Sequence, residues 1–301
     1  MAISNVSRSG ERIQRAVRVA TGAVAAAAIA ACGGGGTADV PAPASTAATP
    51  SVVPATPDAA LTPPVRVAQF NLSQWKLDLP IDRFGGQGGT GGIQNASQTI
   101  ATSQLLAGFV DAYFYADAQG RLIFTAPANG AVTSPGVGSD HSRSELREVY
   151  AGPGADANGN WTGTGVLTGT CAIRAVAPAS SNAVFAQVRS QTNTLALLVY
   201  RPATHDLAVD IYSANASGSG HTVTALVKNV NLGDGIAYSL SVSGNVITAT
   251  VNGATRSSTL DASWVGAPLY FKLGAYHLAP NTGNAPGDMT VVAYSAFAVS
   301  H

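Results

Sequence analysis

Three short segments decide the fold of this chain: Arg143-Ser-Glu145-Leu-Arg147, Gln187-Val-Arg189 and Tyr270-Phe-Lys272-Leu-Gly-Ala-Tyr276. In each segment, charged or hydrogen-bonding residues alternate with apolar ones. Successive side chains of a β-strand point to opposite faces, so each segment is predicted to be a strand with one polar and one apolar face. Side by side, the polar faces would form a wall rich in Arg and Lys, which suits an anionic ligand.

Beyond residue 65, the chain has the pattern of many short strands. Alternating runs such as RLIFTAP, TLALLVYR and VITATVNG are separated by Gly, Asn, Pro and Ser turns, which is typical of an all-β sandwich or barrel. The stretch VSGNVITATVNGAT predicts a hairpin, with Ser243-Gly244-Asn245 as its turn region and Asn252-Gly253 as a second turn signal. One short helix is expected, near Ser97 to Ala107.

The N-terminal part of the chain has the pattern of an export signal. Its arginines precede an Ala/Val-rich run that is too short to span a bilayer and that ends at Cys32, before four glycines. This end resembles a bacterial lipobox, so residues 1–31 are predicted to be a lipoprotein signal peptide, with Cys32 as the lipidated residue. An ordinary cleaved signal is the alternative. The expected location is the outer membrane, cell surface or periplasm, with the lipid as the only membrane anchor.

Residues 32–65 are rich in Ala, Pro and Thr and contain few large apolar side chains. Such a segment cannot offset the entropy of ordering its backbone, so it is predicted to be a flexible tether. Residues 66–301 are enough for one all-β domain, which is expected to be monomeric. If Cys32 carries a lipid, Cys171 has no partner, and it is predicted to be a buried structural thiol.

Charge excludes one class of function. From residue 66 onward there are 12 Lys and Arg against 13 Asp and Glu, so the domain is close to neutral. Nucleic-acid binding usually requires a broad basic surface, and none is indicated. Four of the cations fall in the three opening segments, so positive potential is expected to be local to the wall. The histidines show no zinc-type spacing and no calcium loop is present, so no metal and no cofactor are expected.

The same three segments resemble the signatures of the alginate lyases of polysaccharide lyase family 7. Those signatures run Arg-Ser/Thr-Glu-Leu/Val-Arg, Gln-Ile/Val-His and Tyr-Phe-Lys-x-Gly-x-Tyr-x-Gln, and here they read RSELR, QVR and YFKLGAYHL in the same order. The resemblance extends from NLSQWKLDLP to the end of the chain. It implies a β-jelly roll whose concave sheet holds an acidic polysaccharide, alginate or a related uronan.

β-Elimination in a uronate chain needs a neutraliser for the C6 carboxylate, a base for the C5 proton and an acid for the leaving oxygen. Arg143 and Gln187 are predicted to neutralise the carboxylate, and the family assigns them similar roles. Tyr276 is predicted to be the acid and also the base, because adjacent cations favour its phenolate form. Glu145 is expected to orient Arg143 and Arg147. Substrate-binding residues are expected to be Arg147, Lys272, Glu145 and His141.

Arg189 departs from the family pattern, which has His at this position. An Arg cannot accept a proton at ordinary pH, so a role as base does not carry over. Three explanations remain open: Tyr276 performs both proton transfers, another His such as His141 or His277 replaces the missing one, or the protein is not an enzyme. A separate question is whether Arg189 neutralises the substrate carboxylate or instead pairs with Glu145 or Glu148.

The first explanation keeps Arg, Gln and Tyr together and is favoured. By resemblance, a Tyr that acts as both base and acid suits syn elimination at β-D-mannuronate, and Val188 in the second segment indicates the same preference. The predicted function is therefore alginate cleavage at mannuronate, which leaves unsaturated uronate ends. The alternatives are a non-catalytic uronan-binding jelly roll and a lyase that acts on glucuronan.

Overall fold

The computed structural model describes residues 67–82, 96–133, 141–176, 182–278 and 288–301. All of them lie in one compact unit, Ala59–His301. The predicted signal peptide, Cys32 and the tether fall outside the described residues. Within the described ranges, no helix has the length and apolar character needed to cross a bilayer.

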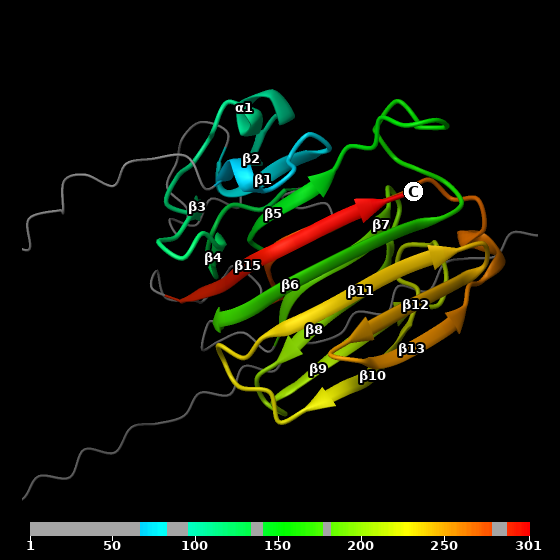
Figure 1. The fold of residues 1–301 in the computed structure, drawn as a ribbon. Helices are drawn as coiled ribbons and strands as arrows, with labels where there is room; N and C mark the ends of the chain where they lie inside the picture. Colours follow the sequence, from blue (N-terminus) through cyan, green and yellow to red (C-terminus); the bar gives the residue numbers. More distant parts are fainter. Residues whose placement is uncertain (1–66, 83–95, 134–140, 177–181, 279–287) are drawn as a thin grey trace, which may run out of the picture. The chain divides into compact units, whose positions relative to one another are not determined.

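The strands of the described residues form two antiparallel sheets (Figure 1). Sheet A has eight strands in the order β10-β9-β8-β7-β14-β5-β1-β2, and sheet C has seven in the order β13-β12-β11-β6-β15-β4-β3. Strands distant in sequence lie side by side, which is typical of a β-jelly roll. The all-β prediction is confirmed.

The strands of sheet A are β1 (Trp75–Asp82), β2 (Ser97–Ile100), β5 (Arg143–Glu148), β7 (Ala183–Ser190), β8 (Thr194–Arg201), β9 (Asp206–Tyr212), β10 (His221–Lys228) and β14 (Leu269–His277). Those of sheet C are β3 (Phe114–Ala116), β4 (Leu122–Pro127), β6 (Gly165–Ala175), β11 (Ile236–Ser243), β12 (Val246–Val251), β13 (Ala254–Thr259) and β15 (Met289–Ser300). Short 3-10 turns lie at Val67–Gln69 and Ala262–Trp264.

Two local predictions have different outcomes. The hairpin is confirmed, because β11 and β12 pair across Gly244 and Asn245, and β12 and β13 pair across Asn252 and Gly253. The predicted helix was too long, since β2 takes its first residues and α1 spans only Thr102–Leu106. Pairing of β2 with β1 decides this difference, because ladder hydrogen bonds to a neighbouring strand outweigh a weak helical preference.

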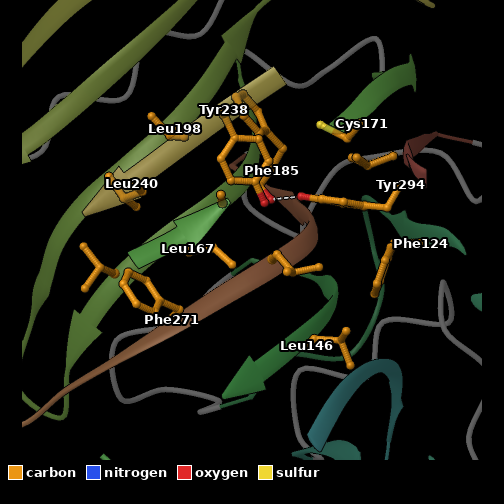
Figure 2. Close-up of a cluster of buried hydrophobic side chains, with 14 of the residues drawn as sticks. Phe124, Leu146, Leu167, Cys171, Phe185, Leu198, Tyr238, Leu240, Phe271 and Tyr294 are labelled. Carbon is orange, nitrogen blue, oxygen red and sulfur yellow. Dashed lines mark hydrogen bonds between the residues drawn. The ribbon is translucent and has the colours of Figure 1, made fainter. Parts of the chain in front are cut away.

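The core lies between the two sheets and contains the apolar faces of the opening segments. Leu146 of β5 and Phe271 of β14 are fully buried there, close to Phe124 and Leu167 of sheet C (Figure 2). The phenol of Tyr294 donates a hydrogen bond to the carbonyl of Phe185, which joins β15 to β7 across the sandwich. Because the apolar faces are fixed inward, the polar faces of β5, β7 and β14 must point outward.

Gly274 sits at an irregularity in β14. The ladder with β5 is continuous here, whereas the register with β7 shifts between Leu273 and Tyr276. Gly274 has a φ of 146°, and an added Cβ would lie 2.4 Å from the carbonyl oxygen of Ser144. Only glycine fits this position, because it has no Cβ and tolerates positive φ. The shift places Tyr276 opposite Val184 and keeps it on the same face as Lys272.

Candidate active site

The outward face of sheet A carries the polar side chains of all three opening segments. Strand β14 lies between β5 and β7, so its Lys272 pairs with Arg147 on one side and Gln187 on the other. On either side of Lys272 in β14, Tyr276 pairs with Arg143 of β5, and Tyr270 pairs with Arg189 of β7. The predicted wall therefore exists, and its central strand comes from the segment that is last in sequence.

A groove with a volume of about 530 Å³ opens on this face. Five cations contribute to its walls, together with hydroxyl and amide groups from neighbouring loops. The lining residues are Lys76, Asp78, Ser97, Thr99, Thr133, Arg143, Arg147, Arg189, Gln191, Thr192, Asn193, Ser217, Tyr270 and Lys272. The groove is strongly polar, and its cations outnumber its carboxylates.

Glu145 is the centre of the polar network. Its carboxylate accepts from the Lys272 ammonium at 2.7 Å, from the Arg143 guanidinium at 3.3 Å and from the Gln187 amide. All four side chains are buried, which strengthens charge-assisted hydrogen bonds. The predicted role of Glu145 in orienting Arg143 agrees with this geometry, and the network shows that it also holds Lys272 and Gln187.

Asp78 of β1 is a member of the network that was not selected from the sequence. Its carboxylate lies 3.2 Å from the Lys272 ammonium and accepts a hydrogen bond from Thr99. Burial acts to raise the pKa of Asp78, but the charges of Lys272 and Arg143 and the hydrogen bonds outweigh it and hold that pKa below its ordinary value. The signal was present in the alternation Lys76-Leu-Asp78, whose strand lies next to β5.

Arg147 is held differently from the prediction. Its guanidinium donates to the side-chain oxygen of Asn160 at 2.6 Å and to the carbonyl of Asn158 at 2.7 Å, and it lies 4.2 Å from the ring centroid of Tyr270. Glu145 therefore orients Arg143 and not Arg147. Arg147 lies two residues beyond Glu145 on β5, where the loop that follows the strand supplies acceptors.

Arg189 is one of the cations that line the groove. Among the described residues it forms no ion pair, and its Nε has no hydrogen-bond acceptor. Pairing with Glu148 is excluded, because Glu148 points into the core, where it binds the Trp161 indole and the His301 imidazole. Glu145 is already occupied by three donors. The positive charge of Arg189 is consequently available to a ligand.

Tyr276 lies beside the groove, between a cation and an imidazole. The Arg143 guanidinium carbon is 4.1 Å from its ring centroid, and the His141 ring centroid is 5.9 Å away in an edge-on arrangement. Burial acts to lower the pKa of Arg143, but its electrostatic interactions with Tyr276, Glu145 and Asp78 outweigh burial and keep that pKa above its usual value. Val184 packs against the Tyr276 ring within a small apolar cluster.

The two alternative histidines occupy different environments. His141 is half-buried and faces Tyr276. His277 is fully buried, and its Nδ1 lies 3.1 Å from the Thr290 hydroxyl. Burial lowers the pKa of His277 to about 4, with His141 adding to the shift. Of these two histidines, His141 is the one whose ring contacts the phenol of Tyr276.

Metal and thiol chemistry have no support in the described part of the chain. No group of three or more His, Cys, Asp or Glu residues is arranged there to hold a metal ion. Cys171 is buried, and burial raises the pKa of its thiol well above the usual range. Because the thiolate is the reactive form, Cys171 is a structural residue.

A jelly roll with a cationic, hydroxyl-lined groove across one sheet defines a class of β-sandwich proteins suited to an anionic ligand. The comparisons with known proteins narrow this class. The alginate lyase family model matches residues 70–301. No match was found among the curated proteins.

Solved structures share the fold. Alginate lyase A1-II', a member of polysaccharide lyase family 7, superposes with a TM-score of 0.65 at 25% identity over 78% of this chain and 98% of that one. A variant of that lyase in complex with substrate (GGMG) gives 0.64 at 25% identity over 78% and 95%. Alginate lyase PA1167 from Pseudomonas aeruginosa gives 0.63 at 28% identity over 77% and 99%. The chain belongs to the alginate lyases of polysaccharide lyase family 7.

Proposed function

We propose that this protein cleaves alginate at β-D-mannuronate by β-elimination and leaves an unsaturated uronate end. The observation that carries the proposal is the placement of Tyr276 against the Arg143 guanidinium, 4.1 Å from the ring centroid, beside a groove whose cations exceed its carboxylates. A groove that only bound a polyanion would need the cations but not a phenol at this position. The complex of the related lyase A1-II' with substrate (GGMG) supports an alginate oligosaccharide as the ligand.

Neutralisation of the C6 carboxylate falls mainly to Arg189 in this scheme. Arg143 and Lys272 are already compensated by Glu145 and Asp78, whereas Arg189 has no carboxylate partner among the described residues. As the C5 proton leaves, negative charge moves onto the substrate carboxylate, so a fixed cation gains strength during the reaction. Gln187 gives one amide N–H to Glu145, and its second N–H adds a neutral donor.

Tyr276 performs both proton transfers. Its phenol oxygen, in the deprotonated form that the reaction requires, takes the C5 proton of the sugar beside the Arg143 guanidinium. The electron pair of that C–H bond forms the C4–C5 double bond, and the C4–O glycosidic bond breaks. The leaving oxygen then takes the proton from the Tyr276 hydroxyl, which restores the phenolate. No other reactant is consumed.

The proposed preference for mannuronate rests on Tyr276 acting as both base and acid. Both proton transfers then take place on one face of the sugar, which suits syn elimination. Val188 contributes nothing by contact, since its side chain is buried in the core. We assign the preference to Tyr276 and Arg189 alone.

The assay is the ultraviolet absorbance of the unsaturated product on alginate, polymannuronate, polyguluronate and glucuronan. The full chain should give the fastest rise on polymannuronate. A fast rise on glucuronan alone would instead assign the activity to that polymer. Salt-sensitive alginate binding without any unsaturated product would identify a binding module and reject the lyase.

We also propose that the protein is an exported, monomeric lipoprotein anchored through Cys32. The support is the lipobox-like ending of the Ala/Val-rich run. The Cys32→Ser variant should accumulate as an unlipidated precursor, whereas the wild type should partition with membranes. Mass spectrometry that finds a free N-terminus downstream of Cys32 in the wild type would reject the anchor.

A further inference from the structure

The outward face of sheet A changes its chemistry from one edge toward the other. One line of paired residues crosses seven strands: Lys76, Arg147, Lys272, Gln187, Leu197, Asp210 and Val223. Its first three members are cations, its centre is an amide and an aliphatic side chain, and its far part contains a carboxylate. Neighbouring strands are about 4.8 Å apart, so Asp210 lies about 10 Å beyond Gln187 along this line. The cationic part of this line and the part that contains Asp210 therefore suit different chemical groups of a ligand.

Asp210 of β9 is a buried carboxylate with an unused acceptor. Its side chain is 7% exposed, and its Oδ1 has no hydrogen-bond partner among the described residues. Arg201 is the closest guanidinium along the sequence, but it donates to both oxygens of Asp206, at 2.6 and 2.7 Å. Burial raises the pKa of Asp210, although His221 and Arg201 oppose the shift. An unpaired buried acceptor is costly, so this oxygen is suited to a donor from a ligand.

Tyr212 provides an aromatic surface beside Asp210. The two residues lie two positions apart on β9, so their side chains share one face. The Tyr212 ring stacks on His221, with centroids 4.9 Å apart and an interplanar angle of 29°. Tyr212 also packs against the apolar cluster that contains Tyr276 and Leu197. An aliphatic and aromatic floor therefore runs from the proposed catalytic phenol toward Asp210.

Tyr212 lies near the proposed reaction centre, because it packs against the cluster that contains Tyr276. Burial raises the pKa of Tyr212, Asp210 and Tyr276 add to the shift, and Arg189 opposes it. The packing of Tyr212 against the cluster that contains Tyr276 places the ring beside the proposed acid and base. A pyranose bound over Tyr212 would adjoin the sugar that reacts at Tyr276.

We propose that the β9–β10 side of this face is a sugar subsite that recognises hydroxyl groups and not carboxylates. The C–H face of one pyranose residue of the uronan stacks on Tyr212, and a hydroxyl of the same residue donates to Asp210. Its carboxylate points away from Asp210, because two carboxylates in contact repel each other. The cationic half of the face holds uronate carboxylates, so the polymer binds in one direction. This assignment rests on the proposed lyase function.

The test compares kcat/KM of the full chain on mannuronate oligomers of increasing length. Tyr212→Ala and Asp210→Leu should each lower kcat/KM by about two- to tenfold on the longer oligomers, the scale of one hydrogen bond or ring contact. On the shortest oligomer that is cleaved, the loss should be smaller than on the longer ones, because that oligomer does not reach the subsite. Tyr212→Phe should lose less than Tyr212→Ala on the longer oligomers, because it keeps the ring. Tyr115→Ala, an exposed tyrosine on sheet C, is the matched control.

Asp210→Asn separates recognition from repulsion. If Asp210 accepts a hydrogen bond from a sugar hydroxyl, loss of its charge should weaken the binding of long oligomers. If its carboxylate only repels the polymer, the neutral variant should bind long oligomers more tightly. Tighter binding by Asp210→Asn, or an equal loss on oligomers of every length, would overturn the subsite. Unfolding midpoints of all variants distinguish a folding defect from a binding defect.

If the wild type forms no unsaturated product, calorimetric titration with the same oligomers still tests the subsite. Weaker binding of long oligomers to Tyr212→Ala would then support the subsite while rejecting the lyase. Unchanged binding of those oligomers would reject the subsite itself.

Discussion

The Arg143 guanidinium lies 4.1 Å from the centroid of the Tyr276 ring, and the two residues are directly paired across β5 and β14. A buried cation over a phenol ring is attracted to the face of that ring and fixes its orientation. Arg143 is itself held by Glu145, so its position is fixed before a substrate binds. This relationship underlies the proposal that Tyr276 transfers protons.

Tyr276→Phe is expected to abolish turnover while leaving alginate binding intact. The change removes one hydroxyl and preserves the ring that packs against Val184 and Arg143. Product absorbance and calorimetric binding measure the two effects separately, and Tyr115→Phe on sheet C serves as the control. Retention of more than a small fraction of wild-type activity would make Tyr276 a stacking residue.

Arg189→Ala is expected to lower kcat by about a hundredfold, the scale for one electrostatic donor aimed at developing charge. Its unfolding midpoint should stay near that of the wild type, because Arg189 forms no ion pair among the described residues. Arg189→His should retain measurable activity and gain activity on polyguluronate, since a base becomes available. Arg256→Ala, on β13 of the other sheet, controls for loss of a cation. Parallel losses of stability and activity would indicate a structural Arg189.

His141→Gln tests whether the half-buried imidazole replaces the missing family His. If Tyr276 performs both transfers, the variant should keep kcat within about threefold of the wild type, well below the hundredfold typical of a lost acid or base. The pH profile of kcat should also keep its shape. A hundredfold loss together with an altered profile would assign the base to His141.

Gly274→Ala is expected to destabilise the domain by about 2–4 kcal/mol, from positive φ and a close Cβ contact together. The added Cβ would lie 2.4 Å from the carbonyl oxygen of Ser144. Denaturant midpoints measure the effect. Gly220→Ala is the matched control, because nothing lies within 4 Å of its added Cβ. Equal midpoints for the two variants would show that β14 adjusts its register freely.

His277 is expected to make the fold sensitive to acid. Its pKa is lowered from 6.5 to about 4 in the folded state, so between these values the unfolded chain binds a proton that the folded chain does not. Stability from this group is therefore present above pH 6.5 and is lost as the pH falls toward 4. His277→Gln should flatten the decline in unfolding free energy over this window. The unfolding free energy of His205→Asn, a change at an exposed turn, should decline over this window as in the wild type. An equally steep decline for His277→Gln would contradict the assignment.

Much of the fold was predictable because alternation is a local signal. The polar and apolar faces of β5, β7 and β14 follow from side-chain alternation alone, and both hairpin turns follow from Asn and Gly at fixed positions. The helix near Ser97 was overestimated, since pairing with β1 is a long-range interaction that local preference does not contain. Asp78 was missed for the same reason, because its partner Lys272 lies 194 residues away.

The sequence by itself determined which side chains share a face, since that depends only on the geometry of an extended backbone. It also determined that Arg189 replaces a His, which removes one base from the chemistry. Only the tertiary structure decided which strands are neighbours. In that order, Glu145 accepts from Arg143, Lys272 and Gln187, and Arg147 donates to Asn160. Among the described residues, Arg189 has no carboxylate partner. Charge compensation depends on distances between side chains on neighbouring strands, and these distances are fixed only when β5 and β7 pair with β14.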